Sequence, residues 1–277
     1  MKIKGYSIRM KSMGRAKAIF AILLLFVLLQ GCKKEFNNEP ELISSHKPSD
    51  AMSTLANSST SYMISFSGYD WVVKNSPLTT RGPGNNYWSA ANVWVDSRGY
   101  LHLKLAKNTK TGKWECAEIA SVNSFGMGTY QFSIEGRVDK LDRNVVLGLF
   151  NYSGLDYYDE MDIEFARWGK KSNPNLNCTL YPAEGSVGTP WSGSAEFALN
   201  GTYSTYRFNR TLTSVLFQGL HGFTNDNSNL FFSKTCTESF ISPKPMPILL
   251  NLWLFQGNIP SDKNSVEIII QRFSYTP

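Results

Sequence analysis

The chain has 277 residues, of which 28 are basic and 22 are acidic, giving a formal net charge of +6. Six of the basic residues lie within the first 17 positions, so the remainder carries 22 basic and 22 acidic residues. This balance excludes the basic surface with which proteins bind nucleic acids.

The N-terminal segment 1–31 combines these basic residues with an apolar run, Ala18–Leu29, that is too short for an ordinary membrane span. We interpret the segment as a bacterial export signal. It ends in Leu28-Leu29-Gln30-Gly31-Cys32, which resembles a lipobox. The resemblance implies cleavage before Cys32 and attachment of lipid chains that anchor the protein to a membrane. Because Gln30 is not the commonest residue there, an ordinary cleaved signal is the alternative.

Residues 32–61 begin with Cys32 and are rich in Asn, Ser, Pro and Glu but poor in aromatic residues. Such a segment buries too little apolar surface to order itself, so it predicts a flexible tether. Lys33-Lys34-Glu35 is similar to short charged tags that direct lipoproteins to the cell surface in the Bacteroidetes. We expect an exported lipoprotein at the outer membrane or cell surface, with the periplasmic side as the alternative.

Residues 62–277 are long enough for one large domain, and their short alternating segments predict an all-β fold. About a dozen strands between turns favour a two-sheet β-sandwich or jelly roll. The predicted strands are Asn92–Asp96, Tyr100–Leu105, Trp114–Ser121, Thr129–Arg137, Val145–Tyr152, the segment after Asp159, Asn177–Tyr181, Ala195–Leu199, Ser204–Asn209, Ser214–Gly219, Ile248–Phe255 and Ser265–Phe273.

The segment after Asp159 carries three carboxylates on one predicted face. In a strand, Met161, Ile163 and Phe165 point to one side, while Glu160, Asp162 and Glu164 point to the other. Like charges at these spacings repel one another, and a core-facing strand does not need them. This cost indicates a site, although an acidic strand edge or a calcium site is the simpler interpretation of the pattern alone.

Two carboxyl groups roughly 5–5.5 Å apart suit glycoside hydrolysis with retention, one as nucleophile and one as proton donor. On a flat strand the Cα atoms of Glu160 and Glu164 would lie roughly 13 Å apart, so a curved strand and inclined side chains must shorten the gap. Asp162 lies between them and is placed to separate their two pKa values.

The stretch Glu160-Met161-Asp162-Ile163-Glu164 resembles the E-apolar-D-apolar-E signature of glycoside hydrolase family 16, a group with a concanavalin-like jelly-roll fold. The resemblance implies a retaining endo-β-glycanase acting on a polysaccharide, with β-glucan as the expected substrate. Glu160 would be the nucleophile, Asp162 the assisting carboxylate and Glu164 the general acid/base. Further similar stretches are Gly82–Trp88, Asn92–Asp96, Gly99–Leu103, Phe125–Tyr130 and Leu250–Trp253.

Two other functions remain open at this stage. A polysaccharide-binding surface lipoprotein would use the same fold without cleaving its ligand, and a transglycosylase would replace water with another sugar. Retention of all three carboxylates favours an enzyme over a binding module. No cofactor is required for this chemistry, and a structural calcium ion is possible but not indicated by the sequence. We expect a monomer that acts on polysaccharide and has no nucleic acid partner.

Several residues are candidates for binding the sugar chain. Trp168 continues the carboxylate face, and Asn251 and Trp253 share one face of the strand Ile248–Phe255. Trp191 is predicted to lie in a loop as an exposed aromatic platform. Asn86, in a Gly-Pro-Gly-Asn-Asn loop, is predicted either to hydrogen-bond a sugar or to make the turn.

The domain contains three cysteines, Cys116, Cys178 and Cys236, so at most one disulfide is expected within it. The sequence does not identify the pair. The three histidines of the chain are scattered without metal-binding spacing, so a zinc site is not expected.

Overall fold

The computed structural model describes residues 62–277. The predicted export signal at 1–31, the lipidated Cys32 and the tether at 32–61 lie outside the described residues. The described part consists almost entirely of strands, confirming the all-β prediction. Three short 3-10 helices interrupt them: η1 (Ala90–Asn92), η2 (Val138–Lys140) and η3 (Phe255–Gly257). No helix among residues 62–277 is long and apolar enough to cross a membrane.

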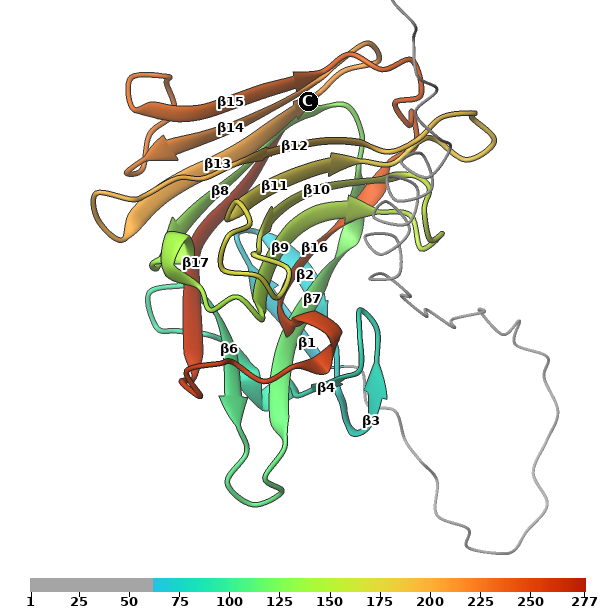
Figure 1. Ribbon diagram of the computed structural model, residues 1–277. Coiled ribbons are helices and arrows are strands. Elements are labelled where there is room, and N and C mark those ends of the chain that lie inside the picture. Colours follow the sequence, from blue (N-terminus) through green and yellow to red (C-terminus); the bar gives the residue numbers. More distant parts are fainter. Residues whose placement is uncertain (1–61) are drawn as a thin grey trace, which may run out of the picture.

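The strands form two antiparallel layers (Figure 1). The first layer has the spatial order β1 (Tyr62–Phe66), β2 (Tyr69–Val73), β7 (Trp114–Phe125), β16 (Met246–Leu254), β9 (Val145–Tyr152), β10 (Glu160–Phe165), β11 (Leu176–Leu180) and β12 (Trp191–Ala195). The second has the order β5 (Val93–Val95), β6 (Leu101–Lys107), β17 (Val266–Thr276), β8 (Gly128–Glu135), β13 (Tyr203–Arg210), β14 (Val215–His221) and β15 (Leu230–Cys236).

The two layers are joined at one end, where β6 pairs with the start of β7. The short strands β3 (Ser76–Arg81) and β4 (Asn86–Trp88) also lie here, and β4 runs parallel to β7. The other strand pairs are antiparallel, as expected for chains that return through short turns. The result is the jelly-roll β-sandwich that the sequence predicted.

The main core lies between the layers and follows the alternation of each strand. In β8, Tyr130, Phe132 and Ile134 are buried, while Thr129 and Gln131 point to the outer surface. Because successive side chains of a strand point to opposite faces, each layer has one face in the core and one outer face. The two outer faces lie on opposite sides of the molecule.

Some predicted strand positions were wrong. The strand predicted at Ala195–Leu199 is β12, Trp191–Ala195, because Asn175 and Asp139 bind the backbone amides of Phe197 and Leu199 and draw the chain out of the sheet. Strand β15 and the hairpin β1–β2 were not predicted. The hairpin turns at Ser67 and Gly68, both of which have positive φ, as two-residue hairpin turns require.

Candidate active site

The strand predicted to have an apolar face and a carboxylate face is β10. It lies in the first layer between β9 and β11. Met161, Ile163 and Phe165 are buried in the main core. Glu160 and Asp162, on the outer face, are only 3% and 4% exposed, while Glu164 is partly exposed. The division of the strand into a core face and a carboxylate face is as expected, and neighbouring strands bury the carboxylates further than an acidic strand edge would be buried.

The start of β10 is held in place by Asp159, a fully buried residue. Its carboxylate accepts a hydrogen bond from Lys244 Nζ at 3.0 Å and one from the Glu184 amide at 3.3 Å. Lys244 also pairs with the Glu184 carboxylate, and the pKa of Lys244 is raised by its hydrogen bonds to Glu184 and Asp159. These contacts determine the position at which the carboxylate strand begins.

Strand register places polar residues in line with Glu164. It lies opposite Gly148 on β9, which in turn lies opposite Asn251 on β16. A Cβ atom on Gly148 would come within 2.5 Å of Asn251 Oδ1, so only glycine leaves room for this amide. The space that a side chain at Gly148 would fill is therefore occupied by the Asn251 amide, in line with Glu164.

Asn251 is held from its far side by Glu118 on β7. Its Nδ2 donates to Glu118 Oε2 at 3.2 Å, and Lys74 Nζ pairs with the other oxygen of Glu118 at 2.9 Å. Asn251 is 1% exposed, and its Oδ1 has no hydrogen-bond partner among the described residues. A buried amide oxygen without a partner is costly unless a ligand hydroxyl completes it.

The residues in register with Asp162 on the neighbouring strands β9, β16 and β7 are apolar. Asp162 lies opposite Phe150, which lies opposite Leu249 and then Ala120. Phe150, Tyr152 and Leu249 form an apolar cluster separate from the main core, with Ala120 packed against it. The carboxylate face of the layer is therefore polar along the register of Glu164 and apolar along the register of Asp162.

The aromatic candidates differ in position. Trp253 is buried on the same face as Asn251, with its ring centroid 6.4 Å from that of Trp168, and Trp168 contacts Phe255 at 5.5 Å. Trp168 is the more exposed ring of this pair and lies beyond the end of β10. Trp253 belongs to the main core cluster, and Trp168 packs against that cluster as a partly buried ring.

Trp191 and Asn86 are positioned by structural contacts. The predicted loop at Trp191 was wrong, because this residue begins β12 and stacks on Phe217 of the second layer at 5.7 Å. Asn86 is buried, and its Nδ2 donates to the backbone oxygens of Pro83 and Leu254. Of the two predictions for Asn86, these bonds support the one in which it makes the turn.

The three domain cysteines are free and buried, so none of them pairs within the described part. Cys178 lies opposite Ile163, on the core side of β10. Burial, followed by the charges of Asp162 and Glu164, raises the pKa of Cys178 well above its ordinary value. Residues 62–277 contain no group of three or more His, Cys, Asp or Glu side chains arranged to hold a metal ion.

Sequence reasoning missed Glu118, Lys74 and the apolar cluster around Phe150. Glu118 does alternate with the core residues Ala117 and Ile119, which places a carboxylate on the outer face of a predicted strand. Only the pairing of β7 with β16, however, brings it to Asn251.

Comparisons with known proteins agree with this architecture. No family model matches the chain. A curated β-glucanase of Paenibacillus polymyxa is 33% identical over 84 residues, covering 29% of this chain and 34% of the relative, so the match spans about a third of that protein. The β-glucanase of Bacillus licheniformis has a similar structure, with a TM-score of 0.58 and 22% identity over 80% of this chain and 100% of that one.

A family 16 endo-glucanase of Bacteroides ovatus, solved in complex with G4G3G-2F-DNP, is also similar, with a TM-score of 0.54 and 16% identity over 74% of this chain and 94% of that one. Similar structures include a pseudo β-1,3-glucanase of Mycobacterium tuberculosis, at a TM-score of 0.55 and 16% identity over 75% of this chain and 91% of that one. The resemblance drawn from the carboxylate motif is thus confirmed at the level of structure: the chain has the jelly-roll fold of the glycoside hydrolase family 16 β-glucanases.

Proposed function

We propose that the protein is a family 16 retaining endo-β-glycanase that hydrolyses a β-glucan. The observation that carries the proposal is the row of three carboxylates on the outer face of β10, with the Asn251 amide lying over Gly148 in line with Glu164. The likeness to β-glucanases in sequence and fold supports β-glucan as the substrate.

In the proposed reaction, the Glu160 carboxylate attacks the anomeric carbon while the bond to the departing oxygen breaks and Glu164 donates its proton to that oxygen. Water then attacks the glycosyl-enzyme, Glu164 accepts a proton from the water, and the Glu160 carboxylate is released. Asp162 lies between the two glutamates, where its charge disfavours a second charge nearby and helps to keep Glu164 protonated.

The sugar chain would lie across the strands of the first layer. Asn251 Oδ1 is suited to accept a hydrogen bond from a sugar hydroxyl, since Glu118 already fixes the amide from the other side. Trp168 would provide an aromatic face at the end of the carboxylate strand.

The test is reducing-sugar release by the full chain and its Glu160→Gln variant from a panel of β-glucans and galactans. We expect cleavage of a β-glucan that is lost in the variant, with the β anomer as the first product by NMR. An α anomer as first product would contradict the retaining mechanism. Exchange of glycan units in place of sugar release would identify a transglycosylase.

A non-catalytic polysaccharide-binding protein is the second candidate, and the similar pseudo β-1,3-glucanase gives it a specific basis. In that case neither the native chain nor the Glu160→Gln variant would release sugar, while both would bind the same polymer equally well. This outcome would replace the hydrolase proposal.

Anchoring through Cys32 stays a prediction. We propose that the protein is an exported lipoprotein of the outer membrane or cell surface. Metabolic labelling with a radioactive fatty acid is expected to mark the native chain and not a Cys32→Ser variant. Protease treatment of intact cells then distinguishes the cell surface from the periplasmic side.

A further inference from the structure

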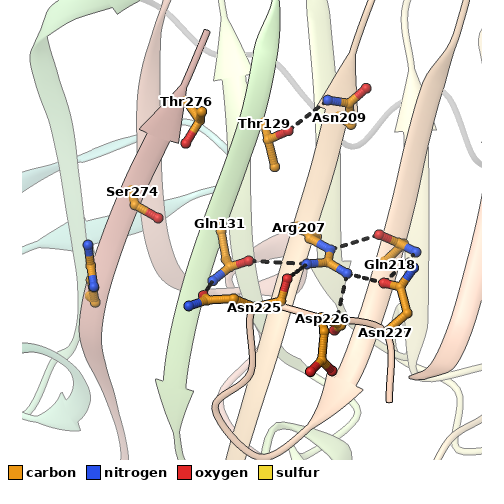
Figure 2. A pocket seen from close by; sticks show the side chains of 11 residues that line it. Thr129, Gln131, Arg207, Asn209, Gln218, Asn225, Asp226, Asn227, Ser274 and Thr276 are labelled. Atoms are coloured by element: carbon orange, nitrogen blue, oxygen red, sulfur yellow. Dashed lines mark hydrogen bonds between the residues drawn. The ribbon is translucent and has the colours of Figure 1, made fainter. Parts of the chain in front are cut away.

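A hollow of about 750 Å³ lies on the outer face of the second layer, on the opposite side of the sandwich from the carboxylates. Figure 2 shows it crossing β17, β8, β13 and β14, with the turn after β14 along one side. Most of its lining side chains end in an amide or a hydroxyl group, and none of them is aliphatic or aromatic: Thr129, Gln131, Arg207, Asn209, Gln218, Asn225, Asp226, Asn227, Arg272, Ser274 and Thr276.

Arg207 is the fixed centre of this hollow and is only 9% exposed. Its Nε donates to Gln218 Oε1 at 2.7 Å, and its Nη1 donates to Gln131 Oε1 at 3.4 Å. The remaining guanidinium donors bind the backbone oxygens of Asn225 and Asp226 and the side chain of Asn227. All five donors of an arginine are thus used, and the turn 225–227 is held against the sheet.

Because all of its donors bind uncharged oxygens, Arg207 holds the walls of the hollow in place and has no donor left for an anion. The amides beside it keep unused capacity. Gln131 Nε2 donates to Asn225 Oδ1 at 3.0 Å, and Asn209 Nδ2 donates to Thr129 Oγ1 at 2.7 Å. Each bond fixes two side chains while leaving an amide donor on Asn225, the oxygen of Asn209 and the hydroxyl proton of Thr129 for a ligand.

The other charged groups of the lining have opposite signs. Arg272 on β17 is exposed, and the turn contributes the carboxylate of Asp226, whose Oδ1 already accepts from Thr224 and Ser228. The lining thus presents a carboxylate as well as guanidinium groups, and a neutral sugar has hydroxyls that donate to a carboxylate and accept from a guanidinium. Fixed donors and acceptors side by side are what a hydroxyl group, which does both, requires.

We propose that this hollow is a second glycan-binding site, selective for neutral, hydroxyl-rich polysaccharide and separate from the carboxylate face. Its volume lies within the range of ligand sites and has room for a short stretch of sugar chain. The choice of a β-glucan as its ligand rests on the proposed function. Two sites on opposite faces would let one molecule hold neighbouring polymer chains and raise its avidity for them.

The experiment uses the full chain carrying Glu160→Gln, so that the polymer is not cut. Affinity electrophoresis measures retardation by soluble mixed-linkage β-glucan and, in parallel, by a sulfated galactan. The test variant adds Thr129→Val and Asn209→Ala; a second test variant adds Arg272→Ala alone. The matched control adds Thr235→Val, at an exposed position of β15 outside the hollow.

We expect the double substitution to weaken binding to β-glucan at least fivefold and Arg272→Ala to weaken it about twofold, with the Thr235→Val control within the error of the parent and no retardation by the sulfated galactan. Unchanged binding in both test variants, a preference for the sulfated galactan, or no binding of β-glucan by the parent would each overturn the second site. Thermal unfolding confirms that the variants are folded. The proposed hydrolysis is tested separately by sugar release from the native chain, so failure of one proposal leaves the other testable.

Discussion

The two outer faces of the sandwich handle charge in opposite ways. On the first layer, Glu160, Asp162 and Glu164 share one strand face. Asp162 lies opposite Phe150, a member of the adjacent apolar cluster. On the outer face of the second layer, the buried charge of Arg207 is surrounded by oxygens that use all of its donors. Like charges close together favour the protonated form of one of the groups, whereas a charge whose donors are all hydrogen-bonded is held rigidly. This difference is the basis on which we propose a reactive first face and a binding second face.

The largest expected effect comes from Glu164→Gln, which removes the proposed proton donor. We expect kcat on β-glucan to fall about 10²–10⁴-fold, since general acid catalysis contributes that much. An aryl glycoside with an acidic leaving group needs no protonation, so the loss there should be much smaller. Glu267→Gln, on an exposed position of β17 in the second layer, is the control and is expected to remain within twofold of the native rate. Equal losses of kcat in Glu164→Gln and Glu267→Gln would show that the carboxylate face has no special role in the reaction.

The next effect is on packing beside the carboxylates. Gly148→Ala would place a methyl group 2.5 Å from Asn251 Oδ1, and we expect the free energy of unfolding to fall by about 1–3 kcal/mol. Urea denaturation measures the change. Gly201→Ala is the matched control, because no atom lies within 4 Å of its added Cβ. A stable Gly148→Ala variant with native activity would show that Asn251 has room to move.

A smaller effect is expected on the second face. Arg207→Lys replaces five fixed donors with three, which leaves acceptors around the turn 225–227 without partners. We expect a loss of about 1–2 kcal/mol in the free energy of unfolding and faster hydrogen exchange in that turn. If exchange there stayed at the native rate, the turn would be held by other contacts and Arg207 would not be its support.

The smallest effect depends on pH and lies at η2, away from both faces. Burial alone would raise the pKa of Asp139, but hydrogen bonds from Arg137 and the Leu199 amide outweigh it and lower that pKa. A carboxyl with a depressed pKa stabilises the fold above its unfolded value of about 3.9, and this contribution disappears as pH falls through the folded pKa. The stability difference between the native chain and Asp139→Asn should therefore be steady from pH 5 to 7 and shrink below pH 4. A constant difference down to pH 2 would contradict the assignment.

The carboxylate strand was predictable because its alternation is a local property. Met161, Ile163 and Phe165 separate from the three acids within six residues, and the structure buries them as expected. Strongly apolar segments, such as Val145–Tyr152, were also found as strands at the predicted positions. The boundaries of β12 were not, because side chains of Asn175 and Asp139 on distant segments determine where that strand ends.

The surroundings of the carboxylates could not be predicted, because they depend on strand register. Glu118 and Gly148 are ordinary strand residues until β7 and β9 pair with β16 and bring both to Asn251. The same holds for the second face, where Arg207 meets the turn 225–227 only after β13 and β14 have paired. Sequence alternation tells which face a residue occupies, and register alone tells which neighbours it has.

The free cysteines make the folded domain insensitive to its redox environment. Cys116, Cys178 and Cys236 are all buried and unpaired, and burial raises the pKa of Cys178, so each thiol is withheld from oxidants and alkylating reagents. A protein that folds without disulfides can be produced in a reducing cytoplasm or in an oxidising compartment with the same native state. Its thiols then act as built-in reporters, because they become reactive only when the sandwich opens, and their labelling rate measures that opening directly.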